Sequence, residues 1–287
     1  MSWLIIGGDG QLGLSFRDLL TKQNIPFDFS TIDTLDITDE KAVDLFVQQR
    51  SPSVVVNCAA WTAVDAAEDN ESAAHAVNCD GARFVARAAN NVGAIYVLVS
   101  TDYVFPGNAT TPYKEDDPTG PVSVYGKTKL CGELAALQEH PSNTYIVRTA
   151  WLYSQYGKNF ARTIARKGLA GDNLSVVNDS YGQPTSALAV ARQIVALVTT
   201  HPPAGIFHAT NAGSATWHEF ASAIVDPIAN HGSVTPVSSS AFPTVAIRPT
   251  YSVLDHTEWS ANGISDMPHW RDSLGEIHST ILDSVKE

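Results

Sequence analysis

The chain is poor in cysteine, in positive charge and in long apolar segments. Its three cysteines, Cys58, Cys79 and Cys131, stand far apart in apolar or helical surroundings. We expect them to be small core residues, because their spacing is typical neither of a disulfide framework nor of a metal site built on cysteine pairs. Only 18 lysines and arginines accompany 30 acidic residues, and the formal net charge of −12 disfavours nucleic-acid binding.

Membrane and metal signatures are also lacking. No stretch of about 18 apolar residues occurs, and no charged and then apolar leader precedes the first apolar segment, so we expect a cytoplasmic protein without a membrane segment. The nine histidines form neither His-x-x-x-His nor His-Glu-x-x-His, and the sequence therefore assigns no metal. His208 is interpreted as a structural residue of a late strand.

What is present is an alternation of strand-period and helix-period segments, in a chain long enough to bury about three quarters of its unfolded surface. This pattern predicts an α/β fold, a Rossmann-type doubly wound parallel sheet with helices on both faces. The expected strands are 3–6, 27–32, 54–56, 94–100 and 145–147, and the expected helices are 11–23, 40–50, 71–92, 158–170, 185–200 and 216–230.

Two units are expected in the chain. Residues 1–151 are predicted to form a dinucleotide-binding domain, because the regular alternation lies there. Residues 152–287 are less regular and rich in turns, and we expect them to form mainly a smaller C-terminal substrate-binding lobe, with some segments returning to the first domain.

A glycine-rich turn follows the first strand directly. Gly7, Gly10 and Gly13 are spaced so that backbone amides can approach a pyrophosphate at the start of the next helix. A glycine cluster alone would indicate only a tight turn. Its position at the first strand-to-helix junction favours a nucleotide-binding site.

A hydroxyl, a phenol and an ammonium group form a second candidate site. Thr101 ends the predicted strand 94–100, and Tyr125 and Lys129 stand four residues apart, on one face of a helix that follows a loop over 106–121. A lysine ammonium there favours the ionised form of a neighbouring phenol. The three groups are predicted at the carboxyl edge of the sheet, where they could transfer a proton to a carbonyl.

Seven motifs follow one another along essentially the whole chain. They are residues 7–13 (GGDGQLG), 35–38 (LDIT), 56–65 (VNCAAWTAVD), 100–105 (STDYVF), 125–129 (YGKTK), 148–151 (RTAW) and 179–185 (DSYGQPT). In this order they resemble the dTDP-4-dehydrorhamnose reductase family of extended short-chain dehydrogenases/reductases. The resemblance implies an enzyme of dTDP-rhamnose biosynthesis, which supplies cell-wall polysaccharide.

The reaction that the resemblance implies is the reduction of a ketone. NADPH, with NADH as an alternative, would give hydride to C4 of dTDP-4-dehydro-L-rhamnose while Tyr125 protonates the oxygen, which yields dTDP-L-rhamnose. Lys129 would hold the nicotinamide ribose and lower the pKa of Tyr125, and Thr101 would hydrogen-bond the substrate oxygen.

The resemblance also implies which residues contact the two ligands. Cofactor contacts, besides Tyr125 and Lys129, are Gly7, Gly10, Gln11, Leu12, Asp36, Ile37, Ala59, Ala60, Trp61 and Thr62. Substrate contacts, besides Thr101 and Tyr125, are Val64, Asp102, Tyr103 and Trp151.

Several of these positions have a plainer structural interpretation. Trp151 could close the core behind a strand instead of lying against a sugar, and Asp36 could simply begin a helix cap. Tyr103 could anchor a loop. Arg248, before a proline on a late loop, could balance the substrate diphosphate or could form a surface ion pair.

The chain departs from the family in a few places. Trp61 stands where many members have histidine or tyrosine, which changes the packing beside the nicotinamide. Ser15 stands where some relatives carry an acid that binds Mg²⁺ at a dimer interface, which argues against a Mg²⁺-bridged dimer. After the second strand, Thr31 would tolerate the 2′-phosphate of NADPH, whereas Asp33 in the ribose position would favour NADH.

Other functions remain open within the superfamily. A dehydratase needs an Asp-Glu pair after the threonine, and Asp102-Tyr103 disfavours it. Another nucleotide-sugar 4-reductase or an epimerase could use the same tyrosine and lysine, and a noncatalytic regulatory subunit could keep the fold. The expected small-molecule partner is a dTDP-sugar, and the expected oligomeric state is a monomer or a homodimer. The epimerase of the preceding step is a candidate protein partner.

Overall fold

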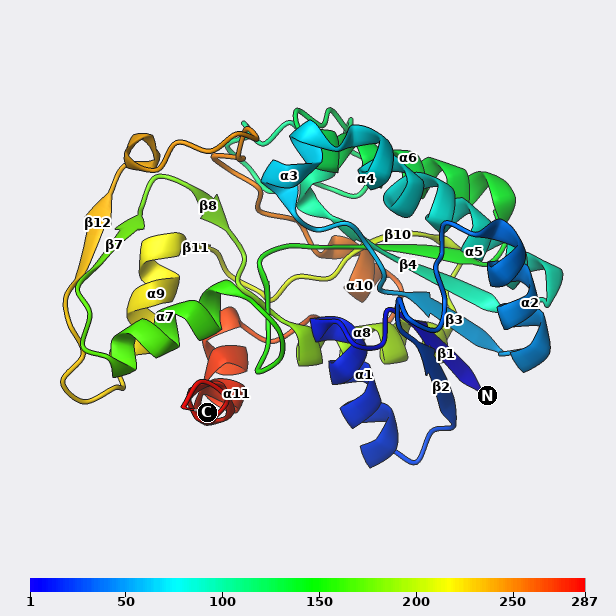
Figure 1. Ribbon diagram of the computed structural model, residues 1–287, viewed down its shortest axis with the longest axis horizontal. Helices are drawn as coiled ribbons and strands as arrows, with labels where there is room; N and C mark the ends of the chain where they lie inside the picture. The colour runs from blue at the N-terminus through cyan, green and yellow to red at the C-terminus, as the bar shows by residue number, and fades with distance from the viewer. Residues whose placement is uncertain (287) are drawn as a thin grey trace.

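A parallel six-stranded sheet forms the centre of the computed structural model, which describes residues 1–286 (Figure 1). Its strand order is β10-β5-β4-β3-β1-β2, and every neighbouring pair is parallel. The strands are β1 (Trp3–Ile6), β2 (Phe27–Ser30), β3 (Val54–Asn57), β4 (Ile95–Thr101), β5 (Thr144–Thr149) and β10 (Gly205–His208). This order confirms the predicted Rossmann-type doubly wound fold.

Helices cover both faces of the sheet, as strands buried on both sides require (Figure 1). On one face, α1 and α8 pack over Ile5, Val56 and Val97, and on the other, α2 and α5 pack over Leu4 and Val55. The helices around the sheet are α1 (Gln11–Lys22), α2 (Glu40–Arg50), α3 (Val64–Asp69), α4 (Glu71–His75), the π-helix η1 (Ala76–Gly81), α5 (Ala82–Asn91), α6 (Val124–Glu139) and α8 (Ala187–Thr200).

The later part of the chain forms a smaller group of elements with its own core around Tyr153, Phe220 and Trp270 (left in Figure 1). Its members are β6 (Leu152–Tyr153), α7 (Phe160–Leu169), β7 (Leu174–Val177), β8 (Tyr181–Gly182), β9 (Thr185–Ser186), β11 (Ala215–Thr216), α9 (Trp217–Val225), β12 (Val234–Val237) and α11 (Trp270–Asp283). Short helices η2 (Asp102–Val104), η3 (Ser239–Ala241) and α10 (Thr257–Ala261) complete the fold. No helix within residues 1–286 has the length and apolar character needed to cross a bilayer.

Two predicted helices differ from those observed. The alanine-rich helix expected over 71–92 is broken by the π-helix η1, which carries Asn78. The Asn78 side chain bonds the backbone N–H and C=O of Trp61 and the hydroxyl of Thr128, and these tertiary contacts override the helical period. Helix α9 ends at Val225 instead of residue 230, because Pro227 has no backbone N–H with which to continue the helical hydrogen bonds.

The expectation that the cysteines are independent core residues is wrong for two of them. Cys79 on η1 and Cys131 on α6 form a disulfide, with Cα atoms 5.2 Å apart. Their separation of 52 residues hides this proximity, which arises because the two helices pack against each other. Cys58 is free, and burial raises the pKa of its thiol to about 12.

A buried ion pair fixes α6 to the sheet. Arg148 on β5 donates from Nε and Nη2 to the Glu133 carboxylate at 3.0 and 2.7 Å, and each side chain is only 2% exposed. Ser100 on β4 donates a further hydrogen bond to the same carboxylate. The pair therefore links the helix that carries Tyr125 and Lys129 to two strands.

Removal of one member of this pair should be costly. We expect Arg148→Met to lower the free energy of unfolding by about 3 to 5 kcal/mol, because Glu133 would remain buried and unpaired. The control is Arg192→Met, which breaks the exposed pair with Glu276 (each side chain 44% exposed) and should cost less than about 1 kcal/mol. Urea unfolding measures both, and equal losses in the two variants would contradict the assignment.

Candidate active site

The glycine turn leaves a helix end free for an anion. Gly7 has φ +75°, and a Cβ there would stand 2.7 Å from the Ala59 backbone nitrogen. A Cβ on Gly13 would collide with the carbonyl oxygen of Gly7, so this glycine permits the close approach of α1 to the turn. Gly10 caps α1 without a side-chain hydrogen bond, so the first-turn amides of α1 remain available to a phosphate group.

Two residues at the start of α1 contribute in different ways. The side-chain oxygen of Gln11 accepts hydrogen bonds from Ser154 at 3.1 Å and Asn159 at 2.9 Å, which ties the turn to the later part of the chain. Leu12 is 4% exposed, with its side chain in the core. Both residues therefore present their backbone amides to the open helix end.

The predicted adenine-side residues follow the second strand. Asp36 is exposed and accepts from the Thr38 amide at 2.9 Å, in a turn just before α2, while Asp39 is the helix cap itself. Ile37 packs its side chain in the core against η1. In the structure Asp36 therefore stabilises a local turn. The parts of this segment that are open to a ligand are the exposed side of Asp36 and the backbone of Ile37.

The segment 59–62 is held by a residue that the sequence analysis missed. Asn78 accepts from the Trp61 amide at 2.8 Å and donates to the Trp61 carbonyl at 3.2 Å. Ala59 and Ala60 are half-buried and Thr62 is exposed, next to the glycine turn. Only the polarity of Asn78 within an alanine-rich helix could have indicated a special role.

Thr101, Tyr125 and Lys129 come together at the carboxyl edge of the sheet. Thr101 is the last residue of β4, and α6 begins at Val124 behind the cap Ser123, whose hydroxyl accepts from the Gly126 amide at 3.1 Å. The exposed fractions of Thr101, Tyr125 and Lys129 are 5%, 9% and 3%. The predicted cluster therefore exists, and it is largely shielded from water.

Burial determines the protonation of the cluster. It raises the pKa of Tyr125, and the neighbouring Thr101 hydroxyl only partly opposes this. Burial also lowers the pKa of Lys129 to about 8, and its ammonium donates to the Val99 carbonyl at 2.7 Å. From the sequence we expect Lys129 to lower the pKa of Tyr125; in the structure burial dominates this pKa, and the group that opposes burial is the Thr101 hydroxyl.

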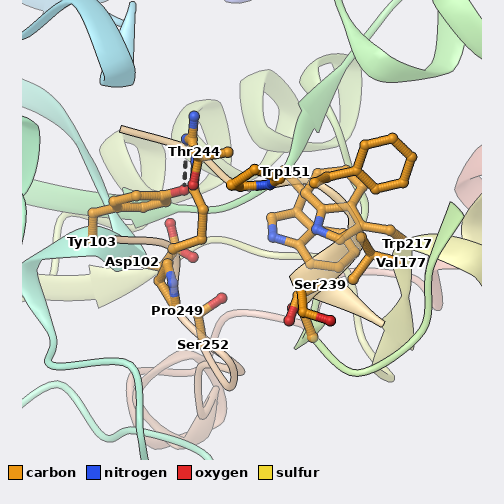
Figure 2. A pocket seen from close by; sticks show the side chains of 14 residues that line it. Asp102, Tyr103, Trp151, Val177, Trp217, Ser239, Thr244, Pro249 and Ser252 are labelled. Atoms are coloured by element: carbon orange, nitrogen blue, oxygen red, sulfur yellow. Dashed lines mark hydrogen bonds between the residues drawn. The ribbon is translucent and has the colours of Figure 1, made fainter. Parts of the chain in front are cut away.

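A cavity of about 470 Å³ opens beside this cluster (Figure 2). Residues of both parts of the chain line it: Asp102, Tyr103, Trp151, Val177, Ser180, Trp217, Ser239, Ser240, Phe242, Pro243, Thr244, Arg248, Pro249 and Ser252. Four predicted substrate residues, Asp102, Tyr103, Trp151 and Arg248, are among them. Val64 lies next to the cavity wall, packed with Tyr103 and Tyr125.

Two tryptophans form an apolar wall of the cavity (Figure 2). Trp151 and Trp217 stack with ring centroids 3.5 Å apart and planes at 11°. Gly182 makes room for them, because a Cβ there would collide with the Trp151 indole. Trp217 was not identified from the sequence as a cavity residue, because no motif connects it with Trp151, which is distant in the chain. The indole of Trp151 thus lines the cavity. The alternative interpretation, in which Trp151 only closes the core behind a strand, did not predict this position.

The polar side of the cavity is built around Arg248. Its guanidinium donates to the Tyr103 hydroxyl at 3.1 Å (Figure 2) and forms an ion pair with Asp65 on α3. Arg248 therefore forms the predicted ion pair and also lines the cavity, while its role toward a substrate diphosphate stays a prediction. The Arg248 side chain remains 37% exposed.

Rossmann-type architecture with a glycine turn facing a Thr/Tyr/Lys cluster defines a nucleotide-binding α/β protein. The model of the RmlD substrate binding domain family matches residues 1–282, and the chain belongs to this family. This confirms the resemblance described above. The dTDP-4-dehydrorhamnose reductase of Streptomyces griseus is 45% identical over 96% of this chain and 92% of that protein. The dTDP-4-keto-6-deoxy-D-glucose reductase of Streptomyces niveus is 42% identical, with 95% and 94% covered.

Solved structures agree with the family assignment. The crystal structure of a dTDP-4-dehydrorhamnose reductase from Bacillus anthracis in complex with NADP has TM-score 0.92 and 37% identity, over 96% of this chain and 97% of that one. The Clostridium acetobutylicum orthologue has TM-score 0.93 and 39% identity, with both chains fully covered (100%). A UDP-glucose 4-epimerase from Thermotoga maritima, at 16% identity and TM-score 0.81, shares the fold.

Asp102 should make stability depend on pH. Burial raises its pKa from an ordinary 3.8 to about 6, so the protonated carboxyl favours the folded state. That stabilisation is complete below pH 3.8 and is lost as the pH rises through 6. Asp102→Asn should therefore gain stability relative to the wild type between pH 4 and pH 7, by about 2 to 3 kcal/mol at most, in denaturant titrations.

The matched variant is Asp179→Asn. Hydrogen bonds from the Ser239 amide and the Ser238 hydroxyl lower the pKa of this exposed carboxyl, so its contribution appears as pH rises. The stability difference from the wild type should then have the opposite pH trend. A pH-independent difference for Asp102→Asn would contradict the buried ionisation.

Proposed function

We propose that the protein reduces the C4 ketone of dTDP-4-dehydro-L-rhamnose with hydride from NADPH, and that Tyr125 donates the proton. The observation that carries this proposal is the buried Tyr125 phenol, which keeps its proton at neutral pH and lies beside Thr101 at the edge of the substrate cavity. The substrate comes from the relatives, several of which are named dTDP-4-dehydrorhamnose reductase.

Each member of the cluster has a separate task. The neutral Tyr125 protonates the alkoxide that forms as hydride arrives, and Thr101 orients the ketone oxygen by a hydrogen bond. Lys129 has two further donor protons besides the one given to Val99, and these bind the nicotinamide ribose. The positive charge nearby also stabilises the developing oxyanion.

The cofactor would lie along the carboxyl edge of the sheet, in the unit formed by residues 1–151. The backbone amides of Gln11 and Leu12, after Gly7 and Gly10, would hold its pyrophosphate, and the segment 59–62 would hold its nicotinamide side. When bound, NADPH supplies the hydride, and the residues of this chain position the cofactor. Asp36 and Ile37, which follow β2 along the chain, would hold its adenine.

The sugar nucleotide occupies the cavity between the two parts of the chain. Asp102, Tyr103 and Val64 face the sugar, Trp151 gives an apolar face, and Arg248 balances the diphosphate. We assign residues 152–287 mainly to the substrate lobe; what supports this division is that, within the described residues, β10 and α8 are segments of this part that return to the sheet. We place the protein in the cytoplasm as a monomer or a homodimer, with the preceding epimerase as a candidate associate.

The proton donor can be tested directly. Tyr125→Phe should lower kcat by about 100- to 10,000-fold, because the phenol proton is lost while the aromatic packing remains. NADPH affinity, measured by fluorescence, should stay close to that of the wild type. The control is Tyr145→Phe, at the opposite edge of the sheet, whose hydroxyl bonds only the Pro202 carbonyl.

The substrate is tested with two ketosugars in parallel. Wild-type protein should oxidise NADPH with dTDP-4-dehydro-L-rhamnose faster than with dTDP-4-dehydro-6-deoxy-D-glucose, the substrate type of the Streptomyces niveus relative. The reverse order would identify another nucleotide-sugar 4-reductase. Conversion without net NADPH oxidation would indicate an epimerase, and NADPH binding without turnover of any ketosugar would refute the reductase proposal.

The cofactor choice rests on the residue after β2. That strand ends at Ser30, so Thr31 follows it directly and Asp33 lies two residues further, exposed. Thr31→Asp should lower kcat/KM for NADPH by about tenfold, since a carboxylate repels the 2′-phosphate, with little loss for NADH. Asp33→Asn is the control and should leave the NADPH/NADH ratio unchanged; an equal effect of both variants would refute this placement.

A further inference from the structure

A histidine and two cysteines gather where α4 and η1 pack against α6, and none of them lines the substrate cavity. His75 and Cys79 stand four residues apart on α4 and η1, and Cys131 faces them from α6. One ligand atom of each residue lies within 4.8 Å of the other two. The proposed reduction uses none of these groups.

The cluster has the ligand types and spacing of a site for a thiophilic cation. Zn²⁺ binds thiolate sulfur at about 2.3 Å and imidazole nitrogen at about 2.0 Å in tetrahedral geometry, so two such ligand atoms stand roughly 3.5 to 3.8 Å apart. The Cys131 sulfur and His75 Nε2 are 3.6 Å apart. Once the disulfide is opened, side-chain rotation at Cys79 and Cys131 can bring the sulfurs to the same spacing, since their Cα atoms are 5.2 Å apart.

The imidazole is already oriented by a carboxylate. His75 Nδ1 lies 3.3 Å from Asp80, whose other oxygen accepts from Arg83 at 3.2 Å. Histidine ligands commonly give their second ring N–H to a carboxylate in this manner, which leaves the other nitrogen free for the metal. Nε2 of His75 is the nitrogen that points to the Cys131 sulfur.

The two helices approach closely enough to share one ion. Gly132 follows Cys131, and a Cβ there would collide with the carbonyl of Asn78, the residue before Cys79. The exposed imidazole and the half-buried Cys131 leave one side of the cluster open to solvent. A fourth ligand from water can therefore complete a tetrahedron.

We propose that the reduced protein binds one Zn²⁺, or a similarly thiophilic divalent cation, through His75, Cys79 and Cys131, and that the disulfide is the alternative, oxidised state of the same site. A dithiol reductant supplies two electrons and two protons to the disulfide and itself becomes a disulfide. The cation then displaces the two thiol protons as it binds.

The site would act on the same contacts that position the proposed proton donor. Both states join η1 to α6, which carries Tyr125 and Lys129, and Asn78 on η1 holds Trp61 and Thr128. Loss of both the ion and the disulfide leaves η1 and α6 joined by their packing and by the hydrogen bond between Asn78 and Thr128.

The test is a Zn²⁺ titration of the protein comprising residues 1–287. The protein is first reduced with a phosphine, and the phosphine is then removed under argon. Calorimetry and competition with a chromogenic chelator should show one Zn²⁺ per chain in the wild type. His75→Gln should weaken binding at least tenfold while leaving the thiols in place, and a Cys79→Ser/Cys131→Ser variant should bind none. His231→Gln, whose ring bonds only its neighbour's carbonyl, is the control and should match the wild type.

Oxidation and labelling complete the design. Diamide-oxidised wild type should bind no Zn²⁺, and bound Zn²⁺ should protect the Cys79 and Cys131 thiols of the reduced protein from maleimide. Circular dichroism and NADPH binding verify that each variant is folded. Two results would overturn the proposal: reduced wild type that takes up no more Zn²⁺ than the double serine variant, or a folded His75→Gln protein that binds Zn²⁺ as tightly as the wild type.

Discussion

The buried carboxylate of Glu133 is the group on which the geometry of the site depends. It accepts hydrogen bonds from Arg148 on β5 and from Ser100 on β4, and it lies one turn after Lys129 on α6. Ser100 in turn precedes Thr101. A buried pair adds little net stability, but its rupture is costly, so helix and strands are held in one arrangement.

The same burial decides the proton chemistry. Removal from water keeps the proton on Tyr125 and lowers the pKa of Lys129 to about 8, while the charge of Glu133 pulls the Lys129 pKa back up. A neutral phenol beside an ammonium held by a nearby carboxylate suits proton donation to a ketone. The carboxylate that anchors α6 thus also favours the charged form of Lys129 near neutral pH.

Features that depend on a few neighbouring residues could be predicted from the sequence. The glycine turn, the strands within residues 1–151 and the Tyr125 and Lys129 spacing are of this kind, because steric and helical rules act locally. Contacts between distant segments could not. Asn78 reaches partners 17 and 50 residues away, Cys79 bonds a cysteine 52 residues away, and Trp217 enters the cavity from the later part of the chain. The π-helix follows from these contacts and not from the alanine-rich pattern.

The junction between the two parts of the chain determines the shape of the cavity. Trp151, directly after the sheet strand β5 and Ala150, has φ +45°, a left-handed conformation that bulky residues adopt only when their surroundings impose it. Those surroundings are the stacked Trp217 and the space that Gly182 leaves. The chain turns there from the sheet into the later elements, so the strained tryptophan both redirects the backbone and presents its ring to the cavity. The shape of the cavity and the path of the chain into the later elements therefore depend on the same residue.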